Sequence, residues 1–463
     1  MDRSYQWVSV VGLGRLGLCL AACLADRGIN TLGVDIDERV VQTVNAGRVP
    51  WFEKGLDDLV ARNAGERLLA TTQHVQAIES TDMTIILVAT PSDPDGSFSN
   101  RFIEAALRSL AEAFGQSRKS HHSFVISSTV MPGSIQESFI PLLEAYSGKK
   151  LHTHFSVCYD PDFVALGNAI HGFLEPDMVV IGESAPTAGA RLAELHDTLC
   201  ANTPKIFRMS IISAEIAKVC LNAYITTKIS FANSISNLCE HIPGADVDSI
   251  TSAIGEDRRI SPYYFRGGLS FGGNCFPRDT HAYTALAEKH GVQAHLIHAT
   301  NAVNRLQEEH VAEVVLRELD RVQTKIVAIL GLAFTPRTPV ITESPSLKLI
   351  HALLERKVCV LATDPLAIDN ARMHFGDVID YFDSPSECLE ECSLAVAMLQ
   401  EGTIQRAIEE FRPKRTLTVI DPWRMLDRAK LDPSIRCIGL GRFDQDSPAS
   451  AITIPAFETN MKG

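Results

Sequence analysis

The segment VSVVGLGRLG, close to the first residue, constrains the fold of this chain most strongly. A β-branched run leads into three glycines, Gly12, Gly14 and Gly17, and a stretch with helical periodicity follows. In such a strand–turn–helix unit, the first glycine permits a tight turn, the second lets the backbone approach a phosphate, and the third allows close helix–strand packing. The helix N-terminus then offers unpaired N–H groups to an anion. The alternative is a glycine turn that binds no ligand.

Asp35 favours the ligand-binding interpretation. It ends a second apolar run about twenty residues after the glycines, where an acidic side chain binds the ribose hydroxyls of a dinucleotide. Its charge would repel a 2′-phosphate. The segment therefore predicts a site for NAD rather than NADP.

The rest of the first half alternates between the two kinds of element. Strand-like runs at 84–90, 123–129 and 154–160 are separated by helical stretches, which is typical of a parallel doubly wound sheet. Ligands bind such sheets beyond the carboxyl ends of the strands, so Thr90 and Thr129 belong on that side. Taken singly, each is more often a turn or cap residue than a functional one.

Residues 211–240 contain no Gly or Pro and have helical periodicity, which predicts a helix long enough to connect two domains. Lys218 and Asn222 lie four residues apart and share one face. That face is either solvated or part of a site. Further along, Cys275 lies in FGGNCFPRDT. From this decapeptide alone, a reactive thiol and a structural cysteine are equally acceptable.

The second half repeats the alternating pattern. The strand-like runs are 324–334, 357–365, 393–400, 416–423 and 436–442. The predicted fold class is therefore α/β, with two Rossmann-like doubly wound domains joined by a long central helix.

Composition excludes several classes of protein. The net charge of −13 argues against a nucleic-acid binder, because such binding requires clustered Lys and Arg. No signal-peptide core and no apolar run of about eighteen residues occurs, so we expect a cytoplasmic protein without membrane contact. The 11 cysteines show no zinc-ligand spacing, which predicts reduced thiols and no metal site.

Taken together, the motifs resemble those of the UDP-glucose and GDP-mannose dehydrogenase family over nearly the whole chain. In order, they are VVGLGRLG, VDID, VATPSDPDG, SSTVMPGS, YDPDFVALGNAI, SAEIAKVCLNAYITTKISFAN, FGGNCFPRDT, GLAFTPR and ESPSLKLI. The resemblance implies oxidation of a nucleotide sugar at C6 to a uronic acid with two NAD molecules. UDP-glucose is the default substrate, and GDP-mannose or a UDP-N-acetylhexosamine is the alternative. A nucleotide-sugar-binding protein without turnover is an alternative of another class.

The resemblance also implies catalytic roles. Cys275 matches the nucleophile that holds the substrate as a thiohemiacetal and then a thioester. Lys218 and Asn222 match the groups that stabilise the oxyanions. Asp279 and Thr129 match residues that order a water for proton abstraction.

It further implies the binding residues and the domains. The expected NAD contacts are Gly12, Gly14, Leu16, Gly17, Asp35, Thr90 and Thr129. The expected substrate contacts are Phe163, Lys218, Asn222, Arg259, Tyr264, Phe271, Gly272 and Phe334. Arg259 matches an arginine that reaches the substrate of a neighbouring subunit, so we expect at least a homodimer. The expected domains are an NAD-binding domain (1–205), a central helical and dimerisation region with the cysteine loop (206–320), a nucleotide-sugar-binding α/β domain (321–443) and a tail (444–463).

Some positions depart from the family pattern. Asp162, which we assign to catalysis of thioester hydrolysis, replaces a Glu in a motif that usually reads Asn-Pro-Glu-Phe, so this step is expected to be slower. Thr335 replaces a lysine that touches the substrate diphosphate, and Thr342 an arginine that contacts NAD. Each lost charge-assisted contact costs about 1.5–3 kcal/mol. Trp423 replaces a basic residue, with Arg424 beside it.

Overall fold

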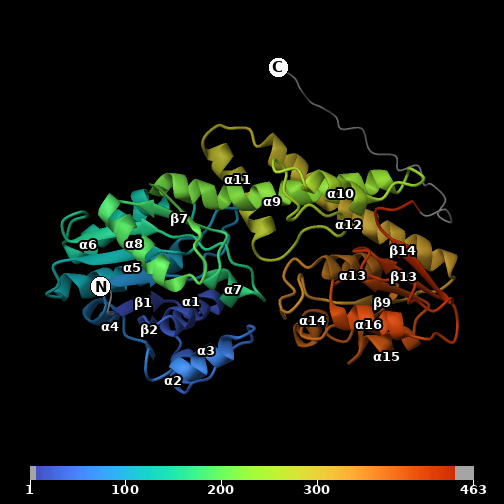
Figure 1. The fold of residues 1–463 in the computed structure, drawn as a ribbon, viewed down its shortest axis with the longest axis horizontal. Coiled ribbons are helices and arrows are strands. Elements are labelled where there is room, and N and C mark those ends of the chain that lie inside the picture. Colours follow the sequence, from blue (N-terminus) through green and yellow to red (C-terminus); the bar gives the residue numbers. More distant parts are fainter. Residues whose placement is uncertain (1–6, 444–463) are drawn as a thin grey trace. The chain divides into compact units, whose positions relative to one another are not determined.

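The computed structural model describes residues 7–443, so the expected tail at 444–463 lies outside the described residues. The chain divides into two compact units (Figure 1). The first contains the residues up to Thr227, Gly272–Asn301 and Ala333–Ser344, and the second contains Lys228–Phe271, Ala302–Leu332 and the residues from Pro345 onward. The division falls inside two long helices, α9 (Ile211–Cys239) and α12 (His295–Arg321).

The first unit is built on an eight-stranded sheet with the order β3-β2-β1-β4-β5-β6-β7-β8. The strands are β1 (Trp7–Val11), β2 (Asn30–Val34), β3 (Leu68–Thr71), β4 (Met83–Ile86), β5 (His122–Ile126), β6 (Phe155–Tyr159), β7 (Met178–Glu183) and β8 (Lys205–Ser210). Neighbouring strands are parallel except β6 and β7, which pair antiparallel through two residues each. The predicted strands and the doubly wound sheet are confirmed.

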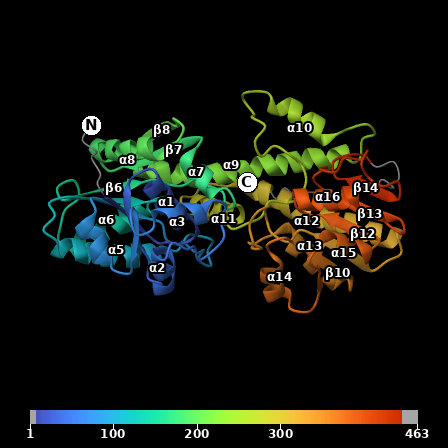
Figure 2. The same ribbon diagram turned by 60° about the horizontal axis from the view of Figure 1, so that its bottom comes forward.

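Helices cover both faces of this sheet (Figure 2). The helices of the first unit are α1 (Arg15–Asp26), α2 (Glu38–Asn45), α3 (Leu56–Asn63), α4 (His74–Ser80), α5 (Arg101–Gln116), the π-helix η1 (Ile135–Phe139), α6 (Ile140–Ser147), α7 (Ala169–Leu174), α8 (Pro186–Leu199) and α11 (Phe276–Lys289), together with the first part of α9. Alternation along β1 supplies two cores, because successive side chains point to opposite faces. Val8 and Val10 pack with α1, and Val11 packs with α5.

The second unit contains a six-stranded sheet with the order β11-β10-β9-β12-β13-β14, and its strand pairs are parallel. The strands are β9 (Ile326–Leu330), β10 (Cys359–Thr363), β11 (Asp380–Tyr381), β12 (Leu394–Ala397), β13 (Leu417–Asp421) and β14 (Ile435–Gly439). The helices are α10 (Val247–Gly255), α13 (Pro345–Glu355), α14 (Ile368–Phe375), α15 (Pro385–Glu390) and α16 (Gly402–Glu410), together with parts of α9 and α12. The predicted second α/β domain is confirmed.

A short turn follows the first strand of the second sheet. Gly331 has φ +102° and donates its N–H to the Thr363 carbonyl at 2.8 Å. The Asp364 carboxylate accepts from the N–H of Leu332 at 2.7 Å and from the N–H of Leu366 at 2.8 Å. Asp364, which follows β10, thus fixes the turn that follows the neighbouring strand β9.

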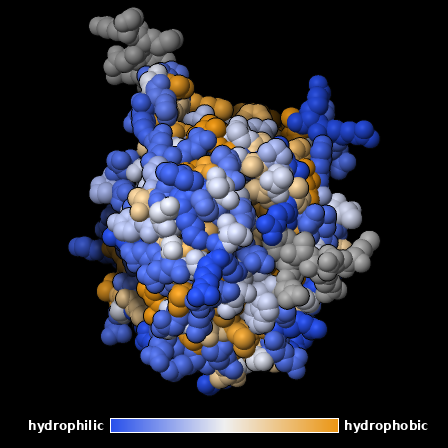
Figure 3. Space-filling model, turned by 90° about the vertical axis from the view of Figure 1, so that its left-hand side faces the viewer, coloured by the Kyte–Doolittle hydropathy of each residue, from blue (hydrophilic) through white to orange (hydrophobic). Residues whose placement is uncertain are grey.

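Polar residues cover most of the face shown in Figure 3, with hydrophobic residues in small separate groups among them. Within residues 7–443, no helix is both long and apolar enough to cross a membrane.

Candidate active site

The glycine turn after β1 has the geometry that its sequence predicts. Gly12 has φ +94°, and a β-carbon there would lie 2.5 Å from the Leu87 carbonyl oxygen. A β-carbon on Gly17 would lie 1.9 Å from the Gly12 carbonyl oxygen, so helix and turn touch directly. At Gly14, by contrast, a β-carbon would meet nothing within 4 Å. The space in front of the α1 N-terminus is therefore open to a ligand, which fits a dinucleotide pyrophosphate.

Asp35 stands at the end of β2 beside this turn. Its carboxylate accepts from the N–H of Leu13 at 2.8 Å and from the N–H of Asp37 at 2.9 Å, as Asp364 does in the second unit. These two bonds orient the carboxylate and leave it lone pairs for ribose hydroxyls. Leu16, in the first turn of α1, packs against the core of the first unit. These residues fit NAD.

Cys275 is the N-cap of α11 and is exposed. Gly273, two residues earlier, has φ +79°, and a β-carbon there would lie 2.5 Å from the ring of Phe334. A residue with a side chain could not occupy position 273 without moving the loop. The glycine run therefore holds the thiol at the start of a helix, where the helix dipole favours an anion.

Charged groups near Cys275 shift the pKa of its thiol in opposite directions. Although the residue is exposed, the protein atoms packed around it remove part of the hydration of the thiol and so raise its pKa. Arg278 and Lys218 lower this pKa, whereas Asp279 and Asp162 raise it. The net effect is a pKa above the ordinary cysteine value, so the free protein holds the thiol protonated at neutral pH.

Asp279 lies one turn further along α11 and is fully buried. Its carboxylate accepts from the Asn222 amide at 2.6 Å and from Arg278 Nε at 3.1 Å. Arg278 also donates to the Thr90 carbonyl at 3.3 Å. No role for Arg278 was predicted from the sequence. The structure shows that it connects the buried carboxylate to the segment after β4.

Lys218 is buried on α9 and donates to the backbone carbonyl of Asp162. Its ammonium also lies 4.9 Å from the centre of the Phe163 ring. Thr129 is buried in the segment after β5. The first unit thus supplies every predicted catalytic residue, from the segments after β5 and β6 and from α9 and α11.

Glu215 is a site-neighbouring residue that the sequence analysis missed. It is fully buried on α9, and its carboxylate accepts from the N–H groups of Gly133 at 2.8 Å and Ile135 at 3.1 Å. Burial raises its pKa to about 7, although the two N–H groups act against this. It ties the segment that follows Thr129 to the turn that carries Lys218. The sequence signal that could have identified Glu215 was an acidic side chain within a mostly apolar part of α9.

The predicted substrate residues divide between the units. Gly272, Phe163 and Phe334 belong to the first unit, and Arg259, Tyr264 and Phe271 to the second. Arg259 is exposed and pairs with Asp257 at 2.7 Å. Tyr264 is exposed with φ +59°, whereas Phe271 is buried and its N–H donates to Asn304 at 2.8 Å.

Lys228, also in the second unit, supports the loop that carries Arg259 and Tyr264. Its ammonium donates to the carbonyls of Ile260, Ser261 and Tyr263 at 3.1, 3.0 and 2.6 Å.

Arg424 does not replace the basic residue that is missing at Trp423. Its guanidinium is fully buried and binds both carboxylate oxygens of Asp248, at 2.7 and 2.8 Å. It also donates to the carbonyls of Gly267 and Leu440. With its donors engaged in this way, Arg424 stabilises the second unit and is not free to bind a phosphate.

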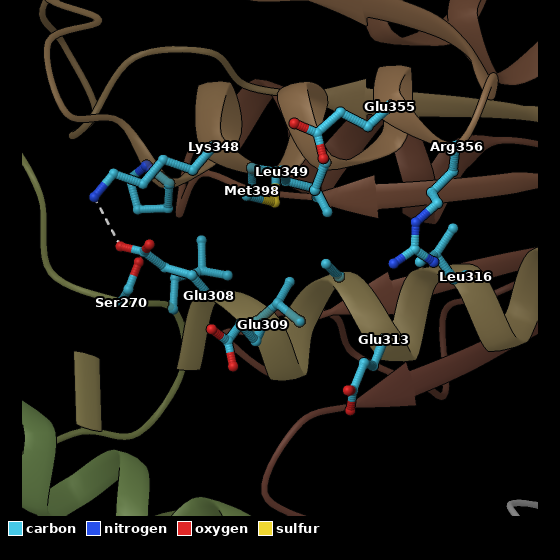
Figure 4. Close-up of a pocket in the computed structure, with 15 residues that line it drawn as sticks. Ser270, Glu308, Glu309, Glu313, Leu316, Lys348, Leu349, Glu355, Arg356 and Met398 are labelled. Carbon is cyan, nitrogen blue, oxygen red and sulfur yellow. Dashed lines mark hydrogen bonds and ion pairs between the residues drawn. The ribbon is translucent and has the colours of Figure 1, made fainter. Parts of the chain in front are cut away.

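A cavity of about 480 Å³ lies in the second unit between α12 and α13 (Figure 4). Glu308 and Lys348 form an ion pair of 2.7 Å across one end, and Glu313 and Arg356 lie toward the other. None of the predicted site residues lines it.

Comparison with known proteins agrees with this geometry. Residues 6–200 match the NAD binding domain of the UDP-glucose/GDP-mannose dehydrogenase family, residues 212–306 its central domain, and residues 328–428 its UDP binding domain. The chain belongs to this family. As a family member it is an NAD-dependent nucleotide-sugar dehydrogenase with a UDP-binding domain.

Individual relatives cover most of the chain. A UDP-glucose 6-dehydrogenase of Haloferax volcanii is 37% identical over 423 residues, which are 91% of this chain and 97% of the relative. A GDP-mannose 6-dehydrogenase of Pseudomonas syringae pv. tomato is 34% identical over 81% of this chain and 84% of its own. The solved structure of a UDP-glucose dehydrogenase from Pyrobaculum islandicum superposes with a TM-score of 0.86 at 29% identity and covers 96% of this chain and 99% of its own.

Proposed function

We propose that this protein oxidises UDP-glucose at C6 to UDP-glucuronic acid through a covalent intermediate on Cys275. The observation that carries the proposal is the cluster in the first unit, where a thiol at a helix N-terminus lies one helical turn from a buried carboxylate hydrogen-bonded to Asn222. A protein that only binds nucleotide sugars would have no use for this combination of groups.

NAD held by the glycine turn and Asp35 would supply the hydride acceptor for each of the two oxidations. In the first, a water ordered by Asp279 and Thr129 takes the proton of the C6 hydroxyl, and an aldehyde forms. The Cys275 thiolate then adds to the aldehyde carbon, and the ammonium of Lys218 and the amide of Asn222 stabilise the resulting oxyanion.

The second oxidation converts this thiohemiacetal to a thioester. Water attacks the thioester carbon, the C–S bond breaks, and the thiol returns to Cys275. In sum, the alcohol, two NAD⁺ and one water give a carboxylate, two NADH and three protons. Asp162 assists the hydrolysis, and its side chain, one methylene shorter than glutamate, makes this the step that we expect to be slow.

The choice of UDP-glucose is supported by the UDP binding domain and by the relatives named above, of which the UDP-glucose 6-dehydrogenase is the more similar and the more completely matched. The test is NADH release with UDP-glucose, GDP-mannose, UDP-N-acetylglucosamine and UDP-N-acetylmannosamine. We expect the largest kcat/KM with UDP-glucose and two NADH per sugar. Turnover of another nucleotide sugar alone would move the proposal to that substrate, and binding without NADH would leave a non-catalytic protein.

The covalent step has a matched control. Cys275→Ala should abolish uronate formation, whereas Cys359→Ser, at an exposed cysteine of the second unit, should retain it. Uronate formation by Cys275→Ala at the normal rate would disprove the mechanism.

We also propose that the protein is at least a homodimer. Tyr224, Phe231 and Leu238 recur every seven residues on α9, and their exposed fractions are 57%, 59% and 60%. Such a stripe of large apolar side chains is typical of a helix face that is covered by another helix. Light scattering should give twice the chain mass, and Phe231→Asp with Leu238→Asp should lower it. A wild-type monomer at micromolar concentration would contradict the proposal.

A further inference from the structure

A buried ion pair lies in the first unit behind the segment that carries Asp162. Nε2 of His196, on α8, is 3.0 Å from each carboxylate oxygen of Asp160, the residue that follows β6. The two side chains are only 13% and 12% exposed. A carboxylate this far from solvent is stable only with a compensating charge, and His196 supplies it.

The backbone of Asp160 is fixed as well. Its N–H donates to the Ile126 carbonyl at 2.8 Å, and its own carbonyl accepts from the Ser127 hydroxyl at 2.8 Å. Two residues later, the carbonyl of Asp162 accepts from the Lys218 ammonium. The segment 160–163 is therefore held at its start by His196 and Ser127 and at its end by Lys218.

From these contacts we infer that His196 is a positioning residue for the reaction: through Asp160 it holds the segment 160–163 so that the Asp162 carbonyl binds Lys218. The inference rests on the proposed function, in which Lys218 and Asp162 act on the substrate. His196 acts on the reaction only through Asp160.

The stabilisation by the His196–Asp160 ion pair depends on pH, because it requires a charged His196. Burial by itself lowers the pKa of His196, but Asp160 more than offsets this and raises it to about 10. Because the folded pKa exceeds the ordinary value of 6.5, the stabilisation is complete below about pH 6.5 and declines as the pH rises toward 10. Other ionisable groups near His196 and along α8 include Arg27, Glu183, Arg191, Cys200 and Arg208.

The test uses the full-length protein in four forms: wild type, His196→Gln, Asp160→Asn and the double variant. His196→Gln leaves the carboxylate without its cation, so kcat should fall by about tenfold or more while KM changes less than about threefold. In the double variant an amide pair replaces the ion pair, and kcat should recover above that of His196→Gln. Wild-type kcat in His196→Gln, or no recovery in the double variant, would overturn the inference.

Asp160→Asn provides a second measurement in case His196→Gln does not fold. Its amide oxygen still accepts from a neutral His196, so the fold and most of the activity should remain. The wild-type decline in kcat and Tm between about pH 8 and 10 should be weaker in this variant. An unchanged decline would contradict the role of the pair.

This readout separates the inference from the proposed function. If no nucleotide sugar gives NADH, the proposed function fails, but the pH dependence of Tm in wild type and Asp160→Asn still tests the ion pair. If the wild type is active and the two Tm profiles coincide, the inference alone fails.

Discussion

The amide of Asn222 donates a 2.6 Å hydrogen bond to the carboxylate of Asp279, which joins α9 to α11 directly beside Cys275. Asp279 is fully buried and has Arg278 as its second donor. A buried carboxylate held by two donors has a fixed orientation, which suits a group that orders a water for proton abstraction. Asn222, Arg278 and Asp279, from two helices, thus form one hydrogen-bonded cluster.

Replacing Asn222 by Asp should disrupt this hydrogen-bonded cluster. Two carboxylates would face each other in a buried site, and one would have to take up a proton. We expect kcat to fall about 100-fold or more, with a lower Tm. Asn202→Asp, at an exposed asparagine elsewhere in the first compact unit, is the control and should change neither kcat nor Tm. Normal turnover by Asn222→Asp would show that Asp279 needs no neutral donor.

The pKa of Cys275 predicts a dependence on alkaline pH. Because its pKa is raised, the thiolate fraction should be small at neutral pH and increase as the pH approaches and passes the ordinary cysteine value. The rate of Cys275 alkylation by iodoacetamide, followed on its peptide by mass spectrometry, should rise accordingly. Lys218→Ala should shift the profile to higher pH and Asp279→Asn to lower pH, since Lys218 lowers this pKa and Asp279 raises it. A midpoint near neutrality in the wild type would refute this assignment.

The glycine turn predicts opposite results for two similar substitutions. Gly14→Ala adds a methyl group where no protein atom lies within 4 Å, so Tm should be unchanged while the KM for NAD increases. Gly17→Ala places its methyl group 1.9 Å from the Gly12 carbonyl oxygen, which should destabilise the fold by about 3 kcal/mol or more. Calorimetry and NADH kinetics on both variants test the pair. If the two variants raised the KM for NAD equally and had the same Tm, this result would argue against a bound pyrophosphate at Gly14.

Thr335 predicts a gain of affinity. By the family resemblance, it stands where a lysine usually contacts the substrate diphosphate. Thr335→Lys should lower the KM for the nucleotide sugar by about tenfold or more, the equivalent of one charge-assisted hydrogen bond. Thr335→Gln, of similar length but uncharged, should have little effect. Equal KM values for the two variants would show that the diphosphate does not reach this position.

Most of the secondary structure was predictable, because apolar runs and helical periods report burial directly. The strand runs at 84–90 and 154–160 correspond to β4 and β6. β6 ends where the polar Asp160 follows, whereas β4 ends at Ile86 although the apolar run continues to Ala89. β8 escaped notice because it is largely exposed and carries Lys205 and Arg208 rather than an apolar run. The antiparallel pairing of β6 and β7 has no sequence signal, because the side-chain alternation of a strand is the same in either direction.

By itself, the sequence determined the glycine turn with Asp35 and the two α/β domains, since each depends on residue type and local spacing. Its resemblance to the family then singled out Cys275, Lys218, Asn222 and Asp279 as catalytic candidates. Only the tertiary structure decided which groups meet. It paired Asn222 with Asp279, bound Glu215 to the N–H of Gly133, joined His196 to Asp160, and bound Arg424 to Asp248. Those contacts join segments that are distant along the chain. Their charges and pKa values depend on burial and on partners that only the folded chain brings together.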